Sequence, residues 1–228
     1  MPTKNKESIV ISLGGSLVAP GAIDVGFLKS FKHSLQKYLK KNRFFILVGG
    51  GKICRHYQKA LLEFGAKNVE RDWMGIHVSM LNAEVVKQLF DKHSYDKIIT
   101  NPNLKVKTNK DIVVGAGWKP GWSTDYDAVL IAKNHNVKTI INLTNVDYVY
   151  DKNPKEFTDA KPFEKIDWKS FGHIVGDKWS PGLSAPFDPR ASKLAEKFKL
   201  KVVMINGKNL DRLENFLDNK SFIGTTIQ

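Results

Sequence analysis

Residues 113–125 have the sequence VVGAGWKPGWSTD, and this stretch decides how the chain folds. Two β-branched residues run into three glycines and a proline, and Ser123 and Thr124 are residue types that favour the N-cap of a helix. Apolar residues at helical spacing follow, at Ala128, Val129, Ile131 and Ala132. The stretch therefore predicts a strand, a tight loop and a capped helix.

The loop within this stretch suits a bound phosphate. Glycines let the backbone approach an anion closely, and the start of a helix points free N–H groups at it. The spacing is neither that of a Walker loop nor that of the dinucleotide-binding G-x-G-x-x-G pattern, because one residue too many separates Gly117 from Gly121. A purely structural strand-to-helix turn is the alternative interpretation.

Two more glycine turns follow apolar runs that predict buried strands. Residues 8–13 lead into Gly14-Gly15-Ser16, and residues 44–48 lead into Gly49-Gly50-Gly51. The helix predicted for 52–64 carries Arg55 and His56 near its start, where a side chain could reach an anion held by the loop. His56 is interpreted as a bystander.

Further along, strands and helices alternate. We predict a helix that begins at Asp24 and buries one face, made of Val25, Leu28, Phe31, Leu35, Tyr38 and Leu39. We predict further helices over 72–90, 188–198 and 210–217. We predict strands over 97–100, 139–143, 202–205 and 222–227, and loops over 101–111 (with an edge strand), 151–162 and 172–189, the last able to fold over a site. The helix 72–90 is expected to bury Trp73, Ile76, Met80, Leu81, Val85 and Leu89.

This alternation indicates an α/β fold in which helices cover both faces of a parallel sheet. Such sheets bind ligands beyond the carboxyl ends of their strands, where all three glycine turns fall. A chain of 228 residues with 42% hydrophobic content fits one large or two-lobed domain.

Composition narrows the class of protein. The single cysteine, Cys54, excludes a disulfide framework and a clustered-cysteine zinc site, which agrees with a reducing compartment. No apolar run approaches transmembrane length, and residues 1–8 lack the apolar core of a signal peptide. A soluble cytoplasmic protein is expected.

The formal net charge of +13 allows either a nucleic-acid surface or attraction of small anions. The lysines are spread along the chain, and no RNA- or DNA-binding motif is present. We favour solvated helix faces and anionic substrates over a dedicated nucleic-acid surface.

Taken together, the motifs resemble those of the amino acid kinase superfamily and, within it, the UMP kinases of the archaeal type. They occur in the family's order as GGS after the first strand, GGGKICR after the second, then DWMGI, GWKPGWSTD, TNVDYVY and FIGTTI. The resemblance runs from about Ile9 to Ile227.

The resemblance implies a three-layer α/β/α sandwich, with ATP and UMP end to end across the carboxyl edge of a mainly parallel sheet. It implies a single domain, with an acceptor-binding part at about 1–125 and an ATP-binding part at about 126–228. ATP and Mg²⁺ are the implied cofactors, with no protein residue assigned as a metal ligand. A homo-oligomer is implied, with the hexamer as the form that the resemblance suggests, and with neither membrane nor specific nucleic acid as partner.

Carried over residue by residue, the resemblance assigns four residues to catalysis: Gly15, Ser16, Arg55 and Asp125. Gly14, Gly15 and Ser16 would hold the transferred phosphoryl region, Gly51 and Arg55 the phosphates between the nucleotides, and Thr144, Asn145 and Tyr150 the adenine nucleotide. Gly50 and Asp72 would bind UMP, together with the loop residues Trp118, Lys119, Pro120, Gly121, Trp122, Ser123 and Thr124.

Phosphoryl transfer fits these residues on physical grounds as well. The protein must align two anions and offset charge on the moving group with N–H groups, cations and Mg²⁺. Asp125 cannot neutralise phosphate, so it would orient the donors or the metal. Alternatively, Asp125 and Asp72 each serve only as a carboxylate at the N-terminal end of a helix. For Arg55 the alternative is a solvated helix-face arginine.

Some positions depart from the family pattern and keep rival functions open. Ser12 stands where many superfamily members have a lysine, although archaeal-type UMP kinases also lack it. Met80, Tyr148 and Asn153 replace an arginine, a glycine and an aspartate, so a catalytically weakened nucleotide-binding or regulatory protein is one rival. Isopentenyl phosphate kinase is another, but that family has a histidine where this chain has Arg55.

Overall fold

The computed structural model describes residues 6–154, 156–178 and 185–228. Part of the loop predicted for 172–189, including Trp179, lies outside the described residues, so its place relative to any site stays a prediction. Among the described residues, no helix is both long enough and apolar enough to span a bilayer.

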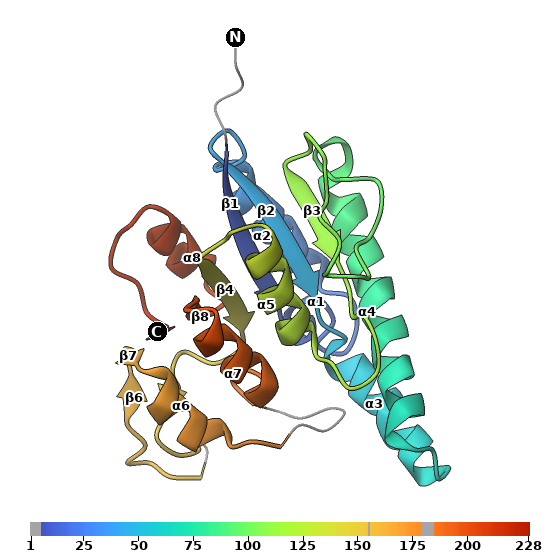
Figure 1. Cartoon of the computed structure of the whole chain (residues 1–228), viewed down its shortest axis with the longest axis vertical. Helices are drawn as coiled ribbons and strands as arrows, with labels where there is room; N and C mark the ends of the chain where they lie inside the picture. The colour runs from blue at the N-terminus through green and yellow to red at the C-terminus, as the bar shows by residue number, and fades with distance from the viewer. Residues whose placement is uncertain (1–5, 155, 179–184) are drawn as a thin grey trace.

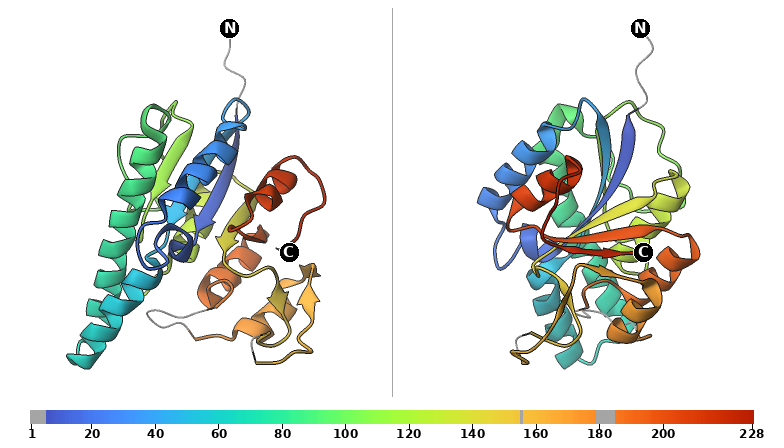
Figure 2. Two further views of the ribbon diagram at one scale, coloured as in Figure 1. Left: turned by 180° about the vertical axis from the view of Figure 1, so that it is seen from behind. Right: turned by 90° about the vertical axis from the view of Figure 1, so that its left-hand side faces the viewer.

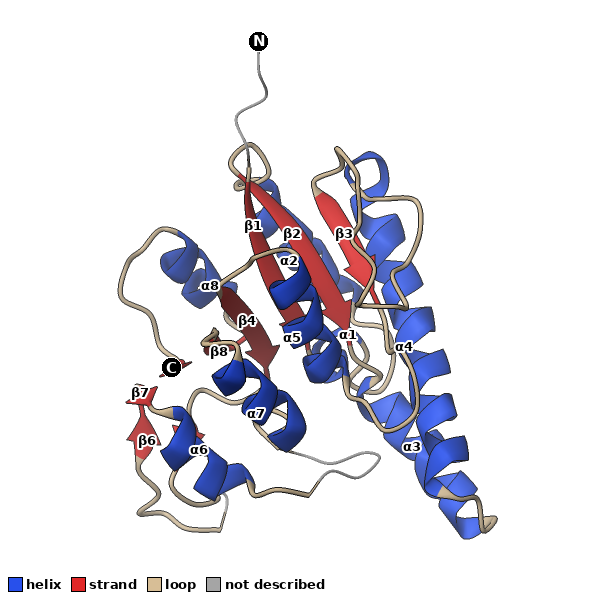
Figure 3. Cartoon of the chain, viewed as in Figure 1, coloured by secondary structure: helices blue, strands red, loops and turns tan. Residues whose placement is uncertain are grey.

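A seven-stranded sheet forms the centre of the molecule (Figure 3). Its strands, in spatial order, are β3 (Ile112–Gly115), β2 (Asn42–Val48), β1 (Glu7–Leu13), β4 (Thr139–Thr144), β8 (Lys201–Asn206), β9 (Thr225–Ile227) and β7 (Lys165–Ile166). All neighbours pair in parallel except β8 and β9. A short antiparallel pair, β5 (Val149–Tyr150) and β6 (Pro162–Phe163), stands apart. The mainly parallel sheet confirms the prediction.

The described helices are α1 (Gly15–Val18), α2 (Val25–Gln36), α3 (Gly51–Glu63), α4 (Asn68–Phe90), α5 (Thr124–Asn134), α6 (Trp168–Val175), α7 (Pro189–Lys197) and α8 (Leu210–Leu217), with a 3₁₀ turn at Asp91–His93. Two helices begin at the predicted caps, because the side chains of Asp24 and Ser123 accept hydrogen bonds from backbone N–H groups of the first turn. Asp188, predicted as the first residue of a helix, caps α7 in the same way.

Two apolar cores, one on each face of the sheet, make three layers. Alternate residues of one strand point to opposite faces, so Ile11 packs with α1, α2, α4 and α8, whereas Val10 packs with α5, α6 and α7. In Figure 1, α5 and α7 lie in front of the sheet, and the left view of Figure 2, turned by 180°, brings α2 to the front. The three-layer α/β/α sandwich is confirmed.

The long helices α3 and α4 extend past the carboxyl edge of the sheet as a pair (Figure 1). The prediction for α4 was wrong in two ways. The helix begins at Asn68 rather than Asp72, and Trp73, Met80, Leu81 and Val85 are exposed. The buried stripe includes Asp72, Ile76, Ser79, Asn82, Ala83, Val86 and Phe90. Apolar residues at helical spacing therefore form a second stripe that faces away from the core.

Other predicted elements are shorter than expected or different. Residues 97–100 form only an isolated bridge at Ile99, and the described residues 101–111 contain no edge strand. The last strand covers 225–227 rather than 222–227, and Val25 is exposed. Residues 172–175, expected to be irregular, belong to α6, whose start Asp167 caps by accepting from the N–H of Ser170.

Candidate functional site

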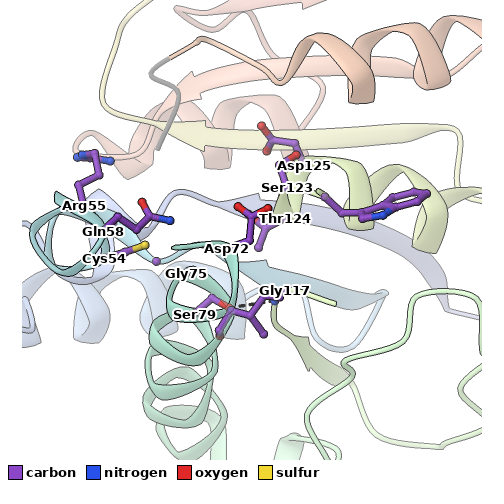
Figure 4. Close-up of a pocket in the computed structure, with 14 residues that line it drawn as sticks. Cys54, Arg55, Gln58, Asp72, Gly75, Ser79, Gly117, Ser123, Thr124 and Asp125 are labelled. Atoms are coloured by element: carbon purple, nitrogen blue, oxygen red, sulfur yellow. Dashed lines mark hydrogen bonds between the residues drawn. The ribbon is translucent and has the colours of Figure 1, made fainter. Parts of the chain in front are cut away.

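A pocket of about 230 Å³ lies at the carboxyl edge of the sheet, where α3, α4 and the segment 117–125 meet (Figure 4). Figure 4 shows Cys54, Arg55 and Gln58 on one side and Ser123, Thr124 and Asp125 on the other, with Asp72 between them in this view. Eight residues predicted for the site line this pocket: Gly50, Gly51, Arg55, Asp72, Trp122, Ser123, Thr124 and Asp125.

The turns after β1 and β2 meet backbone to backbone. A Cβ added to Gly15 would lie 2.3 Å from the nitrogen of Gly51, and one added to Gly51 would lie 2.3 Å from the oxygen of Gly15. Gly51 also has φ +73°, a conformation that favours glycine. Asn82 of α4 holds the second turn by donating to the carbonyls of Gly49 (2.9 Å) and Gly50 (3.2 Å). Side chains are excluded here, so backbone groups form this part of the site.

Asp125 is fixed from two elements other than its own helix. The hydroxyl of Ser12 in β1 donates to its Oδ1 at 2.7 Å, and the N–H of Asp188 donates to its Oδ2 at 3.2 Å. Burial raises the pKa of Asp125 to about 6, although the bond from Ser12 opposes the shift. Ser123 caps α5, so the carboxylate of Asp125 does not act as the N-cap. Its hydrogen bonds come instead from β1 and from the N-cap residue of α7.

Two more carboxyl groups stand near Asp125. Asp127 is fully buried, and its Oδ2 accepts from the N–H of Trp118 at 3.1 Å. Burial raises the pKa of Asp127 well above its usual value, with the charges of Asp125 and Asp188 acting in the same direction. Among the described residues, Oδ1 of Asp127 and Oδ2 of Asp188 have no hydrogen-bond partner. The local environment disfavours a further negative charge unless a cation accompanies it.

Asp72 joins α4 to the 117–123 loop. Its Oδ2 accepts from the N–H of Gly121 at 2.7 Å, and two turns further along the same helix face Ser79 accepts from the N–H of Gly117 at 3.0 Å. Asp72 lies inside α4 rather than at its N-cap, so the helix-cap alternative was wrong for it. Burial raises its pKa despite the bond from Gly121. The carboxyl group thus shapes the loop as well as lining the pocket.

An aromatic cluster is built around Trp122 of this loop, which also lines the pocket. Trp118 and Trp122 lie 5.3 Å apart between ring centroids, Tyr126 meets Trp122 edge-on at 4.1 Å, and the ammonium of Lys119 lies 4.1 Å from the centroid of Trp118. Contacts of this kind restrain the loop, because cation–π and edge-to-face pairs have preferred geometries. Pro120 precedes the positive-φ Gly121.

Arg55 is an exposed residue on the first turns of α3, directly behind the turn at Gly50 and Gly51. It lines the pocket, and among the described residues no hydrogen bond or ion pair engages its guanidinium. Its five N–H donors are therefore available to an anion in the pocket.

The residues predicted for the adenine nucleotide do not line this pocket, and the strand that leads to them ends beside the first glycine turn. The N–H of Gly14 donates to the carbonyl of Leu143 at 2.9 Å, and Thr144 is the last residue of β4. Asn145 is exposed and Tyr150 follows in β5, where its ring lies 6.3 Å from that of Tyr148. Gly14, Gly15 and Ser16 thus separate two regions, the pocket and the surface after β4.

Some pocket residues were not predicted. Cys54 and Gln58 lie on the Gly51 face of α3 at steps of three and four residues, and Gly75, Ile76 and Ser79 continue the face of Asp72 on α4. Helical spacing from the predicted residues would have located them. Burial raises the pKa of the Cys54 thiol to about 11, so the thiol is neutral near pH 7.

The comparison with protein families decides the identity of this arrangement. The family model described as the amino acid kinase family matches residues 7–206, which include the three glycine turns and the pocket. The chain belongs to the amino acid kinase family. Family membership agrees with the fold, in which a mainly parallel sheet has its pocket at the carboxyl edge.

Relatives within the family are similar over nearly their whole length. The chain is 31% identical to a uridylate kinase of Pyrococcus abyssi, covering 96% of this chain and 99% of the relative, and 31% identical to one of Methanospirillum hungatei, covering 100% and 95%. The crystal structure of uridylate kinase from Archaeoglobus fulgidus matches with a TM-score of 0.83 at 28% identity, covering 96% of this chain and 99% of that one.

Proposed function

We propose that this family member is a UMP kinase, which transfers the γ-phosphoryl group of ATP to UMP and releases UDP and ADP. The observation that carries the proposal is the pocket itself, where a glycine turn, an arginine with free donors and a fixed carboxyl group surround one space at the edge of the sheet. The full-length similarity to uridylate kinases supports the choice of acceptor.

In the reaction, an oxygen of the UMP phosphate attacks the γ-phosphorus, and the bond from that phosphorus to the β–γ bridging oxygen breaks, leaving ADP. The protein aligns the two nucleotides and offsets the charge that spreads over the moving group. Backbone N–H groups of the turns at Gly15 and Gly51 would face the phosphates, and Arg55 would add a bidentate cation. Asp125 would orient these donors.

Mg²⁺ fits this site through its chemistry, because the ion prefers oxygen ligands from phosphates and carboxylates. The carboxyl group of Asp125 would lie near it, held by Ser12 and by the N–H of Asp188. When bound, the ion neutralises charge on the β- and γ-phosphates.

We assign the two nucleotides to different halves of the chain. UMP would bind in the pocket formed by residues up to about 125, against Gly50, Asp72 and the loop from Trp118 to Thr124. ATP would bind to the part from about 126, through Thr144, Asn145 and Tyr150, with its phosphates reaching Gly14, Gly15 and Ser16. The division agrees with the two regions that the first glycine turn separates.

We also propose a homo-oligomer, with a hexamer as the expected form, assembled through an exposed apolar surface on α3 and α4. This α3–α4 surface comprises Tyr57, Leu62, Phe64, Val69, Trp73, Met80, Leu81 and Val85. Phe64 is 82% exposed and Leu81 69% exposed. Exposed apolar side chains in this number on one helix pair are typical of a surface that a partner covers. A cytoplasmic location agrees with the single, buried cysteine.

A purified-protein assay with ATP and Mg²⁺ tests the proposal, with UMP and isopentenyl phosphate offered as separate acceptors. Turnover of UMP supports a UMP kinase. Preferred turnover of isopentenyl phosphate, or nucleotide binding without any turnover, would each contradict it in favour of one of the rival functions.

A further inference from the structure

Gly121, in the middle of the 117–123 loop, is held on both sides of its backbone by different parts of the chain. Its N–H donates to Oδ2 of Asp72 in α4 at 2.7 Å. Its carbonyl accepts from Nη1 of Arg190 in α7 at 2.6 Å. Its φ of +85° lies in a region that glycine adopts far more readily than other residues. The loop is therefore fastened to a helix of the acceptor half and to a helix of the donor half at one residue.

The start of α7 makes a second contact with the site. The N–H of Asp188, the N-cap residue of α7, donates to Oδ2 of Asp125, two residues before Arg190. Two hydrogen bonds hold the cap, because Oδ1 of Asp188 accepts from the N–H groups of Arg190 and Ala191, each at 2.7 Å. A single short segment thus contacts both the carboxyl group at the centre of the site and the loop of the pocket.

We propose that Arg190 is a positioning residue for the acceptor nucleotide, acting through the carbonyl of Gly121. The proposal rests on the proposed function, because it assumes that the 117–123 loop binds the acceptor. A hydrogen bond from a charged donor to a carbonyl is stronger than one from a neutral donor. Loss of the Arg190 guanidinium would therefore free one side of the loop, while Asp72 would still hold the other. The loop would then bind the acceptor less well, although the chemistry at the glycine turns is unchanged.

Arg190 reaches the loop from the other side of the sheet. α7 packs against α5 and α6 in the core on the face of the sheet opposite α4. The carbonyl of Gly121 is therefore held by a helix that belongs to a different layer from the helix that holds its N–H.

Three variants test the proposal: Arg190→Ala, Arg190→Lys and the control Lys193→Ala. Lys193 is an exposed cation on the same helix, and it pairs with Asp177 rather than with the loop. Arg190 is exposed, so its removal leaves the core intact. Hydrogen–deuterium exchange of the peptide that contains residues 117–123 is measured without nucleotide, and steady-state kinetics are measured with UMP and ATP varied separately.

In Arg190→Ala, we expect the amide hydrogens of this peptide to exchange at least about threefold faster than in the parent. We also expect KM for UMP to rise by about three- to tenfold, the scale of an exposed charged hydrogen bond. The kcat and KM for ATP should stay within about twofold, lysine should recover part of the loss, and Lys193→Ala should match the parent. Unchanged exchange, or an equal rise in both KM values, would overturn the proposal. If the parent does not turn over UMP, the proposed function fails, whereas the exchange measurement still decides whether Arg190 holds the loop.

Discussion

The hydroxyl of Ser12 lies 2.7 Å from Oδ1 of Asp125 and donates a hydrogen bond to it. A small neutral donor at the end of β1 therefore supports the buried carboxyl group where many members of the superfamily would place a cation. Its ionisable neighbours are both acidic, Asp127 on its own helix and Asp188 at the start of α7. The ionised form of Asp125 thus depends on hydrogen bonds alone until a cation binds.

Ser12→Ala should shift the pH dependence of activity. The bond from Ser12 lowers the pKa of Asp125 against the larger effect of burial, so removing it raises that pKa further above about 6. If the ionised form is active, the acid limb of kcat/KM for UMP moves up by on the order of one pH unit. Ser34→Ala is the matched control, since this buried serine donates to Glu214 away from the site. An unshifted limb in Ser12→Ala would contradict the account.

Asp125→Asn should stabilise the ligand-free protein at high pH. The pKa of Asp125 is raised from 3.8 to about 6 in the folded protein, so the folded state favours the neutral carboxyl group. The contribution of this group to folding stability is fully present below pH 3.8 and is lost as the pH rises through 6. The shift corresponds to about 3 kcal/mol of unfolding free energy. The variant's advantage over the parent should therefore grow by up to about that amount between pH 4 and pH 8. Urea unfolding at the two pH values measures it, and a constant difference would refute the pKa assignment.

Loss of turnover is expected for the same variant, by about a hundredfold or more, because the orienting carboxylate is gone while the fold persists. A residue that only supports the start of α5 would leave the turnover number nearly unchanged. Measuring kcat on the folded variant thus separates the two roles that the sequence left open for Asp125.

Arg55→Ala should lower the turnover number for UMP by about tenfold to a thousandfold, the scale of losing one cation contact in the transition state. Lysine should restore only part of it, because it lacks the planar fork. Lys59→Ala, on the same helix and mostly exposed beside Glu63, is the control. Parental turnover in Arg55→Ala would make Arg55 a solvated helix-face residue. If Arg55→His instead made isopentenyl phosphate the preferred acceptor, without other losses, the assignment of this loop to UMP would be contradicted.

Leu81→Lys should break or weaken the oligomer, because it places a charge on the α3–α4 surface at a side chain that is 69% exposed in the monomer. Leu104→Lys is the control, at a 62% exposed leucine on the loop after residue 100. Light scattering after size exclusion gives the mass of each. Equal masses for parent and Leu81→Lys would place the interface elsewhere.

Local signals were sufficient for the strands that end at the pocket edge and for most of the longer helices. The caps at Asp24, Ser123 and Asp188 were predictable because a short polar side chain before an apolar periodic run has a physical role there. The helix 72–90 shows the limit of periodicity. Its apolar stripe at Trp73 and Met80 has the same spacing as the buried stripe at Asp72 and Ser79, and the sequence does not tell which stripe faces the sheet.

For the site, the sequence predicts which segments lie close together but not which side chains form hydrogen bonds. That the glycine turns lie together follows from parallel strands that end at one edge. That Ser12 donates to Asp125, or that Arg190 donates to the carbonyl of Gly121, depends on residues 113 and 69 positions apart in the chain. Such pairings are set by tertiary packing, which no local pattern encodes.

The central claim is tested most directly by the acceptor preference of the purified chain. With ATP and Mg²⁺ held saturating, UMP, CMP, dUMP and isopentenyl phosphate are each titrated, and ADP release is followed. A kcat/KM for UMP at least about tenfold above every other acceptor, corresponding to about 1.4 kcal/mol of preferential transition-state binding, is the predicted result. A higher value for isopentenyl phosphate, or no turnover of any acceptor by folded protein, would contradict it.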